Sequence, residues 1–269
     1  MKKTIYIILG YLIITACEPT LIAEFEDKPV VYCYLEAGTS PILTVAKLIA
    51  FRDDVVYSDE DVNRLSITVT DETEGKNYQL QSIGDGKYEN SQLIAQTGHT
   101  YSLNFIYNNS HISATTSVPE APQNVEFSAT SAGVFGSSYD VSTRAETGPG
   151  QGIVITWNND ERNYYIVEGF TTSTTLIRSS STTPDKSFKL DYTQSNTITL
   201  SQMQFHYIGN YEISLIRILK EYAVMSQGSS ETSTSLVDIK GNIDGGYGIF
   251  TGINRVKQNI NIYRQTSPF

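Results

Sequence analysis

Cysteine, tryptophan, histidine and basic residues are all scarce in this chain. Its 269 residues include two cysteines, one tryptophan and three histidines, and 19 Lys and Arg stand against 29 Asp and Glu. A net charge of −10 and the lack of a Lys/Arg run after residue 3 exclude a nucleic-acid-binding protein, because phosphates require a basic face. The charged fraction of 18% is too low for a disordered acidic tail or a coiled coil. An apolar fraction of 39% can bury the core of one or two compact domains.

The first residues resemble a lipoprotein leader. Two lysines precede an apolar run over residues 4–15, which is short for a membrane-spanning helix and typical of a signal peptide. The run ends in Ile14-Thr15-Ala16-Cys17, which resembles a lipobox. We therefore expect a signal peptide over residues 1–16, a lipid on Cys17 and a tether over 17–28. The alternative is an uncleaved anchor helix followed by a chance cysteine.

Once Cys17 is lipidated, Cys33 is the only thiol left, and it cannot close an intrachain disulfide. It lies in the apolar run Val30–Leu35 with no histidine nearby in sequence. A reactive thiol needs a setting that lowers its pKa, so we expect Cys33 to be buried filler of a strand.

The chain is predicted to be all-β, because Val, Ile, Thr and Tyr alternate or cluster in short runs about ten residues apart. Within residues 29–120, the series G-x-Y, G-x-x-Y-x-L and A-T-T-x-V-P resembles the closing strands of an immunoglobulin-like or carboxypeptidase-regulatory-like sandwich, and the strand spacing supports a sandwich. The expected strands of this first domain are Val30–Leu35, Ile42–Ala46, Leu65–Thr70, Tyr78–Leu80, Gly86–Tyr88, Gly98–Leu103 and Ala114–Pro119.

Pro119-Glu120-Ala121-Pro122 is expected to be an exposed joint between domains, because prolines cannot donate to a strand ladder. The first domain is therefore expected to fold alone. Residues 121–269 are predicted to form a larger, mostly β domain with a loop over 132–151 and one short helix over 219–225. Its expected strands are Val125–Ser131, Gly152–Trp157, Tyr164–Thr171, Ser187–Tyr192, Thr197–Leu200, Tyr211–Ile218, Gly246–Thr251 and Gln258–Tyr263.

Several motifs, in this order, resemble one family. They are the lipobox, the early V-V-Y-x-Y-L, S-I-T-V-T-D-E before G-D-G-K-Y, the V-P domain end, Trp157 followed by Asn163-Tyr164-Tyr165, and G-N-I-D-G-G-Y-G-I-F-T-G at 241–252. The chain thereby resembles the Bacteroidota lipoproteins grouped as domain of unknown function 4249. The resemblance implies a two-domain β-sandwich lipoprotein at the outer membrane, often associated with TonB-dependent transporters of the starch-utilisation (Sus) kind. It implies no catalytic role and brings no functional residues.

Residues that could do chemistry are sparse. His99, His111 and His206 have no metal-ligand spacing, so we expect surface or turn histidines. Asp53-Asp54 and Asp59-Glu60-Asp61 could offer oxygens to calcium, but the EF-hand pattern is absent and a solvated loop is favoured. No G-x-S-x-G elbow occurs. We therefore predict no catalytic residue, no metal and no cofactor.

The glycine-rich segment 241–252 superficially resembles a phosphate loop, but it lacks the spacing and the following Lys-Ser/Thr. We expect it to be structural. Ile249 and Phe250 should face opposite sides of a core strand, and the glycines should adopt positive φ or admit a neighbouring backbone.

Tyrosine is abundant, with 18 residues, and several that could form a site all fall in the second domain: Tyr164, Tyr165, Tyr192, Tyr207, Tyr211 and Tyr222. Amphipathic rings can stack on sugars or dock partners. The alternative, which we favour, is ordinary filling of a β-sheet.

Three function classes remain open. The first choice is a non-catalytic accessory binding or scaffold lipoprotein, lipid-anchored on either face of the outer membrane, in a TonB-dependent (Sus-type) uptake complex. The second is a stand-alone glycan- or peptide-binding surface lipoprotein, which would need a concave tyrosine-lined site. The third is a secreted hydrolase, which would need two carboxylates converging in a cleft. The sequence names no ligand.

Overall fold

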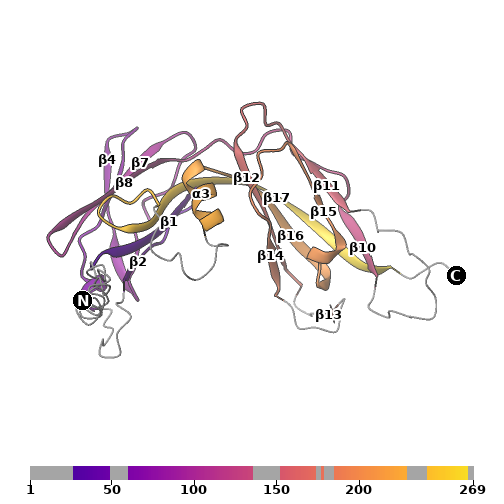
Figure 1. The fold of residues 1–269 in the computed structure, drawn as a ribbon, viewed down its shortest axis with the longest axis horizontal. Helices are drawn as coiled ribbons and strands as arrows, with labels where there is room; N and C mark the ends of the chain where they lie inside the picture. Colours follow the sequence, from indigo (N-terminus) through magenta and orange to yellow (C-terminus); the bar gives the residue numbers. More distant parts are fainter. Residues whose placement is uncertain are drawn as a thin grey trace, which may run out of the picture.

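The computed structural model describes residues 27–48, 60–135, 152–173, 177–178, 185–228 and 241–265. Within these ranges the chain forms two β-sandwiches side by side, joined by one long strand (Figure 1). The predicted signal peptide, Cys17, Asp53-Asp54 and Asp59 lie outside the described residues. The all-β fold predicted from the sequence is confirmed.

The first sandwich packs a four-stranded sheet against one half of a ten-stranded sheet. Buried and partly exposed residues alternate along its strands, as a half-buried pleated surface requires. The small sheet has the order β4 (Lys76–Gln79), β3 (Thr68–Asp71), β7 (Thr100–Tyr107) and β8 (Ser110–Ser117). The facing half contains β1 (Pro29–Glu36), β2 (Leu43–Lys47), β6 (Lys87–Glu89) and β5 (Gln81–Gly84), with the short helix α2 (Glu60–Asn63) beside it.

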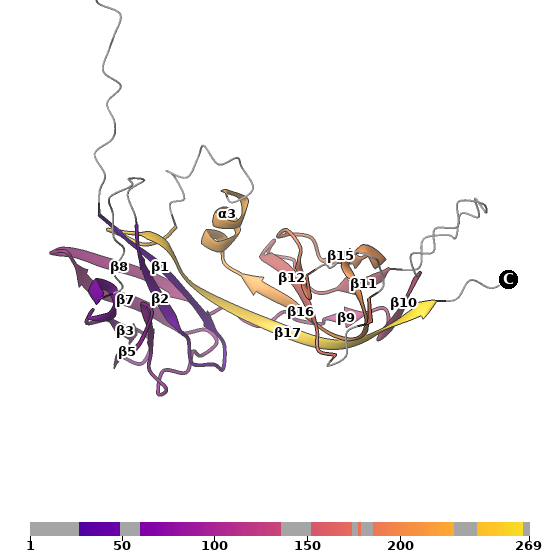
Figure 2. The same ribbon diagram turned by 90° about the horizontal axis from the view of Figure 1, so that it is seen from below.

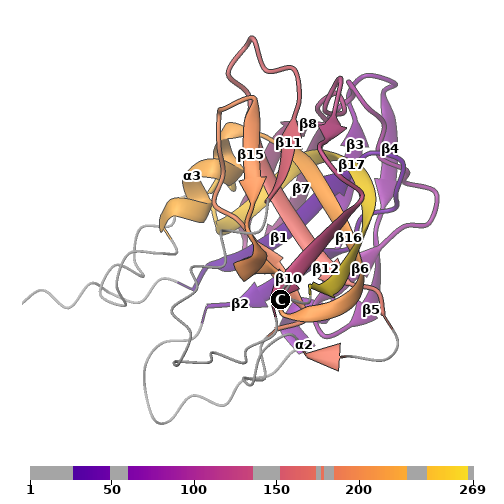
Figure 3. The same ribbon diagram turned by 90° about the vertical axis from the view of Figure 1, so that its right-hand side faces the viewer.

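The second sandwich packs a three-stranded sheet against the other half of the ten-stranded sheet (Figure 3). The small sheet has the order β15 (Thr197–Leu200), β11 (Ile153–Thr156) and β9 (Glu126–Phe127). The facing half contains β14 (Ser187–Lys189), β12 (Tyr164–Thr171), β16 (Tyr207–Ile218), β13 (Ile177–Arg178) and β10 (Ser131–Phe135). A 3-10 turn, η1 (Gln202–Gln204), follows β15.

One strand, β17 (Tyr247–Gln265), belongs to both sandwiches. It pairs in parallel with β1 over residues 247–253 and antiparallel with β16 over 253–262. The sequence predicts two separate closing strands here. This prediction is wrong, because they are parts of one continuous strand. The strand does not break, because the polar residues between them pair across the sheet: Arg255 with Glu36, and Lys257 with Glu212.

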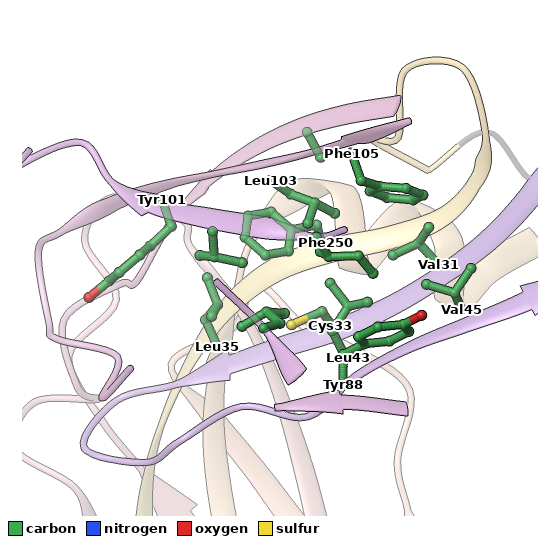
Figure 4. Close-up of a cluster of buried hydrophobic side chains, with 14 of the residues drawn as sticks. Val31, Cys33, Leu35, Leu43, Val45, Tyr88, Tyr101, Leu103, Phe105 and Phe250 are labelled. Atoms are coloured by element: carbon green, nitrogen blue, oxygen red, sulfur yellow. The ribbon is translucent and has the colours of Figure 1, made fainter. Parts of the chain in front are cut away.

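The alternating side chains of β17 reach three cores. Phe250 projects into the first sandwich, where it lies among side chains from both sheets (Figure 4). Ile260 and Ile262, on the same side of the strand, enter the core of the second sandwich. Ile249 and Ile253 point to the opposite side, which confirms that Ile249 and Phe250 face apart.

The glycine-rich segment before β17 is a structural turn. Asn242 replaces a missing strand neighbour: its Oδ1 accepts from the N–H of Phe250 at 3.0 Å, and its Nδ2 donates to the Phe250 carbonyl at 2.7 Å. Gly245 and Gly248 have φ of +77° and +99°. A Cβ on Gly248 would lie 2.0 Å from the Val31 carbonyl oxygen, so only glycine fits there.

The proline-containing joint is not exposed as the sequence analysis expected. Pro119 and Pro122 are both buried. The Nδ2 of Asn254, in the middle of β17, donates to the Pro119 carbonyl at 2.9 Å and lies 3.1 Å from Thr97 Oγ1. The buried joint therefore packs on the strand that both sandwiches share.

The short helix predicted over residues 219–225 is confirmed as α3 (Lys220–Gly228). It lies outside both sandwiches, on the concave side of the bent sheet (Figure 2). Glu221 Oε1 accepts from Thr251 Oγ1 at 3.1 Å and Thr116 Oγ1 at 3.3 Å, so the helix is bonded to β17 and to the first sandwich.

The expected strand positions vary in accuracy. The predicted bounds of β12 and β15 are correct. Of the strand expected over 125–131, the short β9 forms in the middle. The loop was expected to begin at Ala132, but its first residues belong to β10, which pairs with the end of β17. This parallel pairing joins residues about 130 positions apart, and no local pattern indicates it.

Candidate binding trough

A trough crosses the concave face of the ten-stranded sheet, where the two sandwiches meet. Its floor is formed by three isoleucines from neighbouring strands, Ile166 of β12, Ile216 of β16 and Ile253 of β17. Helix α3 forms one wall, and the turn between β1 and β2, residues 39–42, forms the other. Two adjoining hollows of about 400 and 420 Å³ share Tyr34, Ile166 and Tyr222, and we call them together the trough.

Tyrosines from both halves of the molecule meet in the trough. The rings of Tyr34, on β1, and Tyr222, on α3, lie 5.2 Å apart at an angle of 45°. Burial, followed by the neighbouring Tyr222, raises the pKa of Tyr34 well above its usual range, so its hydroxyl stays protonated. Lys189 Nζ donates to the Tyr222 hydroxyl at 2.7 Å. Tyr32 is 43% exposed at the rim.

Charged side chains along the trough form a chain of ion pairs. Arg255 Nε lies 2.7 Å from Glu36 Oε1, and Arg255 Nη1 lies 4.0 Å from Glu168 Oε2. Glu168 Oε1 is in turn 3.7 Å from Lys189 Nζ. Because the chain joins β1, β17, β12 and β14, it links the two sandwiches electrostatically. Two carboxylates and two cations alternate, which leaves little net field along the chain.

The six tyrosines singled out in the second domain fall into two groups, at the trough and in the core. Tyr192 and Tyr222 line the trough, and Tyr164 touches Tyr192 edge-on with ring centroids 5.5 Å apart. The other three, Tyr165, Tyr207 and Tyr211, are buried core residues of the second sandwich. For these three, the filler interpretation is confirmed.

Tyr32 and Tyr34 are the trough residues that sequence reasoning missed. They alternate with Val31, Cys33 and Leu35, which are buried in the first core. In a strand such alternation sends Tyr32 and Tyr34 to the opposite face. The period-two pattern therefore indicates that these two tyrosines leave the core. It does not indicate what they face, because the rest of the trough comes from β12, β14 and α3, far along the chain.

The histidines do not gather into a site. His99 Nδ1 lies 2.8 Å from Asp71 Oδ2, and this carboxylate, which is buried, also accepts from the backbone N–H groups of Thr73 and Glu74. Burial by itself would raise the pKa of Asp71, but these hydrogen bonds lower it below its usual value. His111 is exposed and His206 half-buried.

The described part of the acidic loop is engaged in surface ion pairs. Asp61 lies 3.2 Å from Lys47, and Glu60 lies 3.3 Å from Arg64. In the part of the chain that the structure describes, no three His, Cys, Asp or Glu side chains are grouped closely enough to hold a metal ion.

Cys33 is buried in the core of the first sandwich, as expected for strand filler. Burial raises the pKa of its thiol to about 12, so the nucleophilic thiolate is negligible at neutral pH. Among the described residues, no helix has both the length and the apolar character needed to cross a bilayer.

Comparison with known proteins identifies one family. The family described as domain of unknown function (DUF4249) matches residues 14–259. No curated protein matches. Solved structures with similarity include domains A168–A170 of titin, at 12% identity and a TM-score of 0.20, and the chicken CNTN1 FN1–FN3 domains, at 11% and 0.22. The alignments cover 72% and 71% of this chain, and only 62% and 60% of those chains.

Proposed function

The chain belongs to the DUF4249 family, and we propose that it is a lipid-anchored, non-catalytic accessory binding or scaffold protein of the outer membrane. In this proposal Cys17 holds the acyl chains, and the two sandwiches present the trough to a partner or ligand. The complex it serves is a TonB-dependent (Sus-type) nutrient-uptake system. The acyl chains must provide the membrane affinity, because an acidic chain is not attracted to anionic headgroups.

The attachment of the tether supports an anchored arrangement. Asp27 accepts hydrogen bonds from the Tyr107 hydroxyl at 2.9 Å and from Asn108 Nδ2 at 2.8 Å. These bonds fix the end of the tether beside the β7–β8 turn. Ten residues separate Cys17 from Asp27 in the sequence, which gives a reach of at most ~36 Å. A lipid on Cys17 would therefore hold the first sandwich near the bilayer.

One observation in particular favours binding over catalysis: four charged groups of the trough, Glu36, Glu168, Lys189 and Arg255, are paired with one another. Glu36 and Glu168 both approach Arg255, and Lys189 bonds to Tyr222. A hydrolase would need at least one carboxyl group able to exchange protons with a substrate. Charged side chains that already contact one another in this way suit a preorganised binding surface.

A stand-alone glycan- or peptide-binding surface lipoprotein is the second candidate. The tyrosine-lined trough favours it, because concave sites with aromatic walls and a few placed polar groups are typical of ligand binding. It differs from the first candidate in needing no membrane partner.

Purification from native outer membranes tests the first candidate. A TonB-dependent barrel should copurify with the tagged chain in mild detergent. Isolation of the chain alone, with ligand binding intact, would support the second candidate instead.

Replacement of the lipidated cysteine tests the anchor. Cys17→Ala should abolish incorporation of labelled palmitate and release the protein from membranes, because the remaining chain offers no comparable anchor. Cys33→Ala is the matched control, since it removes the other cysteine and should leave labelling unchanged. Unchanged palmitate labelling in Cys17→Ala would contradict the lipoprotein proposal.

A further inference from the structure

We propose that the trough binds a neutral oligosaccharide, recognised by side chains alone. The inference rests on the proposed binding function and adds the chemical class of ligand. It follows from three features of the trough: the pairing of its floor strands, the balance of its charges and the placement of its tyrosines.

The floor of the trough offers no free backbone. Its strands β12, β16, β17 and β1 are interior strands of the ten-stranded sheet, each with a neighbour on both sides. An extended peptide usually binds a sheet by adding a strand to an open edge, through main-chain hydrogen bonds. That mode is unavailable across this floor, so recognition must come from side chains.

The charges of the trough select against an anionic ligand. Lys189 and Arg255 are matched by Glu36 and Glu168, and Asp191 adds one carboxylate at the rim. A phosphate or carboxylate ligand would have to displace a carboxylate already paired with these cations. A neutral ligand with many hydroxyl groups can instead donate to the carboxylates and accept from the cations without breaking the pairs.

The tyrosines supply apolar surface of the kind a sugar ring can cover. The face of a phenol ring carries partial negative charge, which attracts the polarised C–H groups on the flat side of a pyranose. Tyr32 is 43% exposed and Tyr34 and Tyr192 are half-buried, so these rings offer the surface. Tyr222 is only 9% exposed, and Lys189, whose Nζ lies 4.8 Å from the centre of its ring, fixes its position. Fixed rings lose little side-chain entropy when a ligand binds.

The shape of the trough suits a chain of sugars better than one enclosed sugar. Each hollow has a volume of about 400 Å³, within the ordinary range of ligand sites, and both are open to solvent. They adjoin through Tyr34 and Tyr222, so a ligand can continue from one to the other.

Affinity electrophoresis of the full chain in gels containing neutral α-glucan, β-glucan, mannan or xylan tests the proposal. At least one polymer should retard the protein, and calorimetry with the corresponding hexasaccharide should give saturable binding. Tyr32→Ala should weaken this binding by about tenfold or more, because it removes an exposed ring at the rim. Tyr263→Ala is the matched control: Tyr263 is 48% exposed on β17 but lies outside the trough, so binding should not change.

Several results would overturn the inference. They are no retardation by any of the four polymers, equal binding by wild type and Tyr32→Ala, or preference for a charged polyuronate or an extended peptide. Lys189→Met offers a second check away from the rim. Loss of the bond to Tyr222 should also weaken binding, and the thermal midpoint should stay close to wild type. A copurifying barrel with no sugar binding would refute this inference and leave the proposed function standing.

Discussion

The two sandwiches differ in where their strands come from. The core of the second sandwich is drawn entirely from residues 125–262, so all of it follows the joint in the sequence. The first sandwich takes most of its core from residues 31–118 but also buries Ile243 and Phe250 from the far end of the chain. Its strand β1 depends on the start of β17 as a parallel neighbour.

This difference means that the first sandwich is completed by the far end of the chain. Parallel pairing between segments more than 200 residues apart carries a high loop-closure cost, which the packing of Phe250 and the bonds of Asn242 must offset. The same strand then continues into the second sandwich. We conclude that the two halves form one folded body.

Removing the distant strand should have the largest effect. A fragment over residues 29–120 lacks the neighbour of β1 and the buried Phe250, so we expect a poorly dispersed amide NMR spectrum, contrary to the sequence-based expectation that it folds alone. A fusion that appends residues 241–253 through a flexible linker should restore dispersion. A well-dispersed spectrum for the short fragment would show that the first sandwich folds without the distant strand.

Truncating one side chain should weaken the first sandwich next most strongly. Phe250 is fully buried, and Phe250→Ala should lower the free energy of unfolding by about 3–5 kcal/mol in urea titrations. The exposed Ile106, in the same sandwich, is the control, and Ile106→Ala should change stability by roughly 0.5 kcal/mol or less. Equal small losses in both variants would mean that Phe250 is not a core contact.

Two glycines distinguish backbone strain from close packing. Both Gly248 and Gly38 have positive φ, but an added Cβ meets the Val31 carbonyl only at Gly248 and open space at Gly38. Gly38→Ala should cost only strain, about 1 kcal/mol, whereas Gly248→Ala should cost clearly more because β1 must shift. Thermal melts of the pair check this order. Equal losses would show that contact between β1 and β17 is loose.

A pH-dependent effect is expected for a hydrogen-bonded pair that lies within the first sandwich, Asp71 and His99. The lowered pKa of Asp71 means that its charged form stabilises the fold above the unfolded-state value of about 4, and that this stability is lost as the pH falls through the lower folded-state value. Asp71→Asn should therefore cost about 1–3 kcal/mol at pH 7 and progressively less below pH ~4. Urea titrations of the wild type and Asp71→Asn at pH 7 and below pH ~4 check this dependence, and a cost that does not change with pH would contradict it.

Local patterns predicted the strands well where a strand follows its own alternation. The strand expected over Gly98–Leu103 exists as Thr100–Tyr107 and buries every second residue, although its bounds differ. The bounds of β12 and β15 are correct because their apolar runs end at turn residues. The single strand β17 was missed because Asn254, Arg255 and Lys257 resemble a break. These residues remain in the strand because their partners lie in β1, β16 and the joint.

The trough could be predicted only in part. Tyr192 and Tyr222 were among the tyrosines singled out, but nothing local separated them from the buried Tyr165, Tyr207 and Tyr211. The remaining lining comes mostly from β1 and the turn after it, β12, β14, β16 and β17, which form one sheet only through long-range pairing. Sequence reasoning can assign each residue to a face of its strand, but the site depends on which strands meet.

Differential scanning calorimetry of the full chain, with and without Phe250→Ala, tests the central claim most directly. If β17 makes the two sandwiches one body, the wild type should unfold in a single transition whose calorimetric and van't Hoff enthalpies agree. Phe250→Ala should then move that whole transition to lower temperature. Two separate transitions, with only the first shifted by Phe250→Ala, would contradict the account.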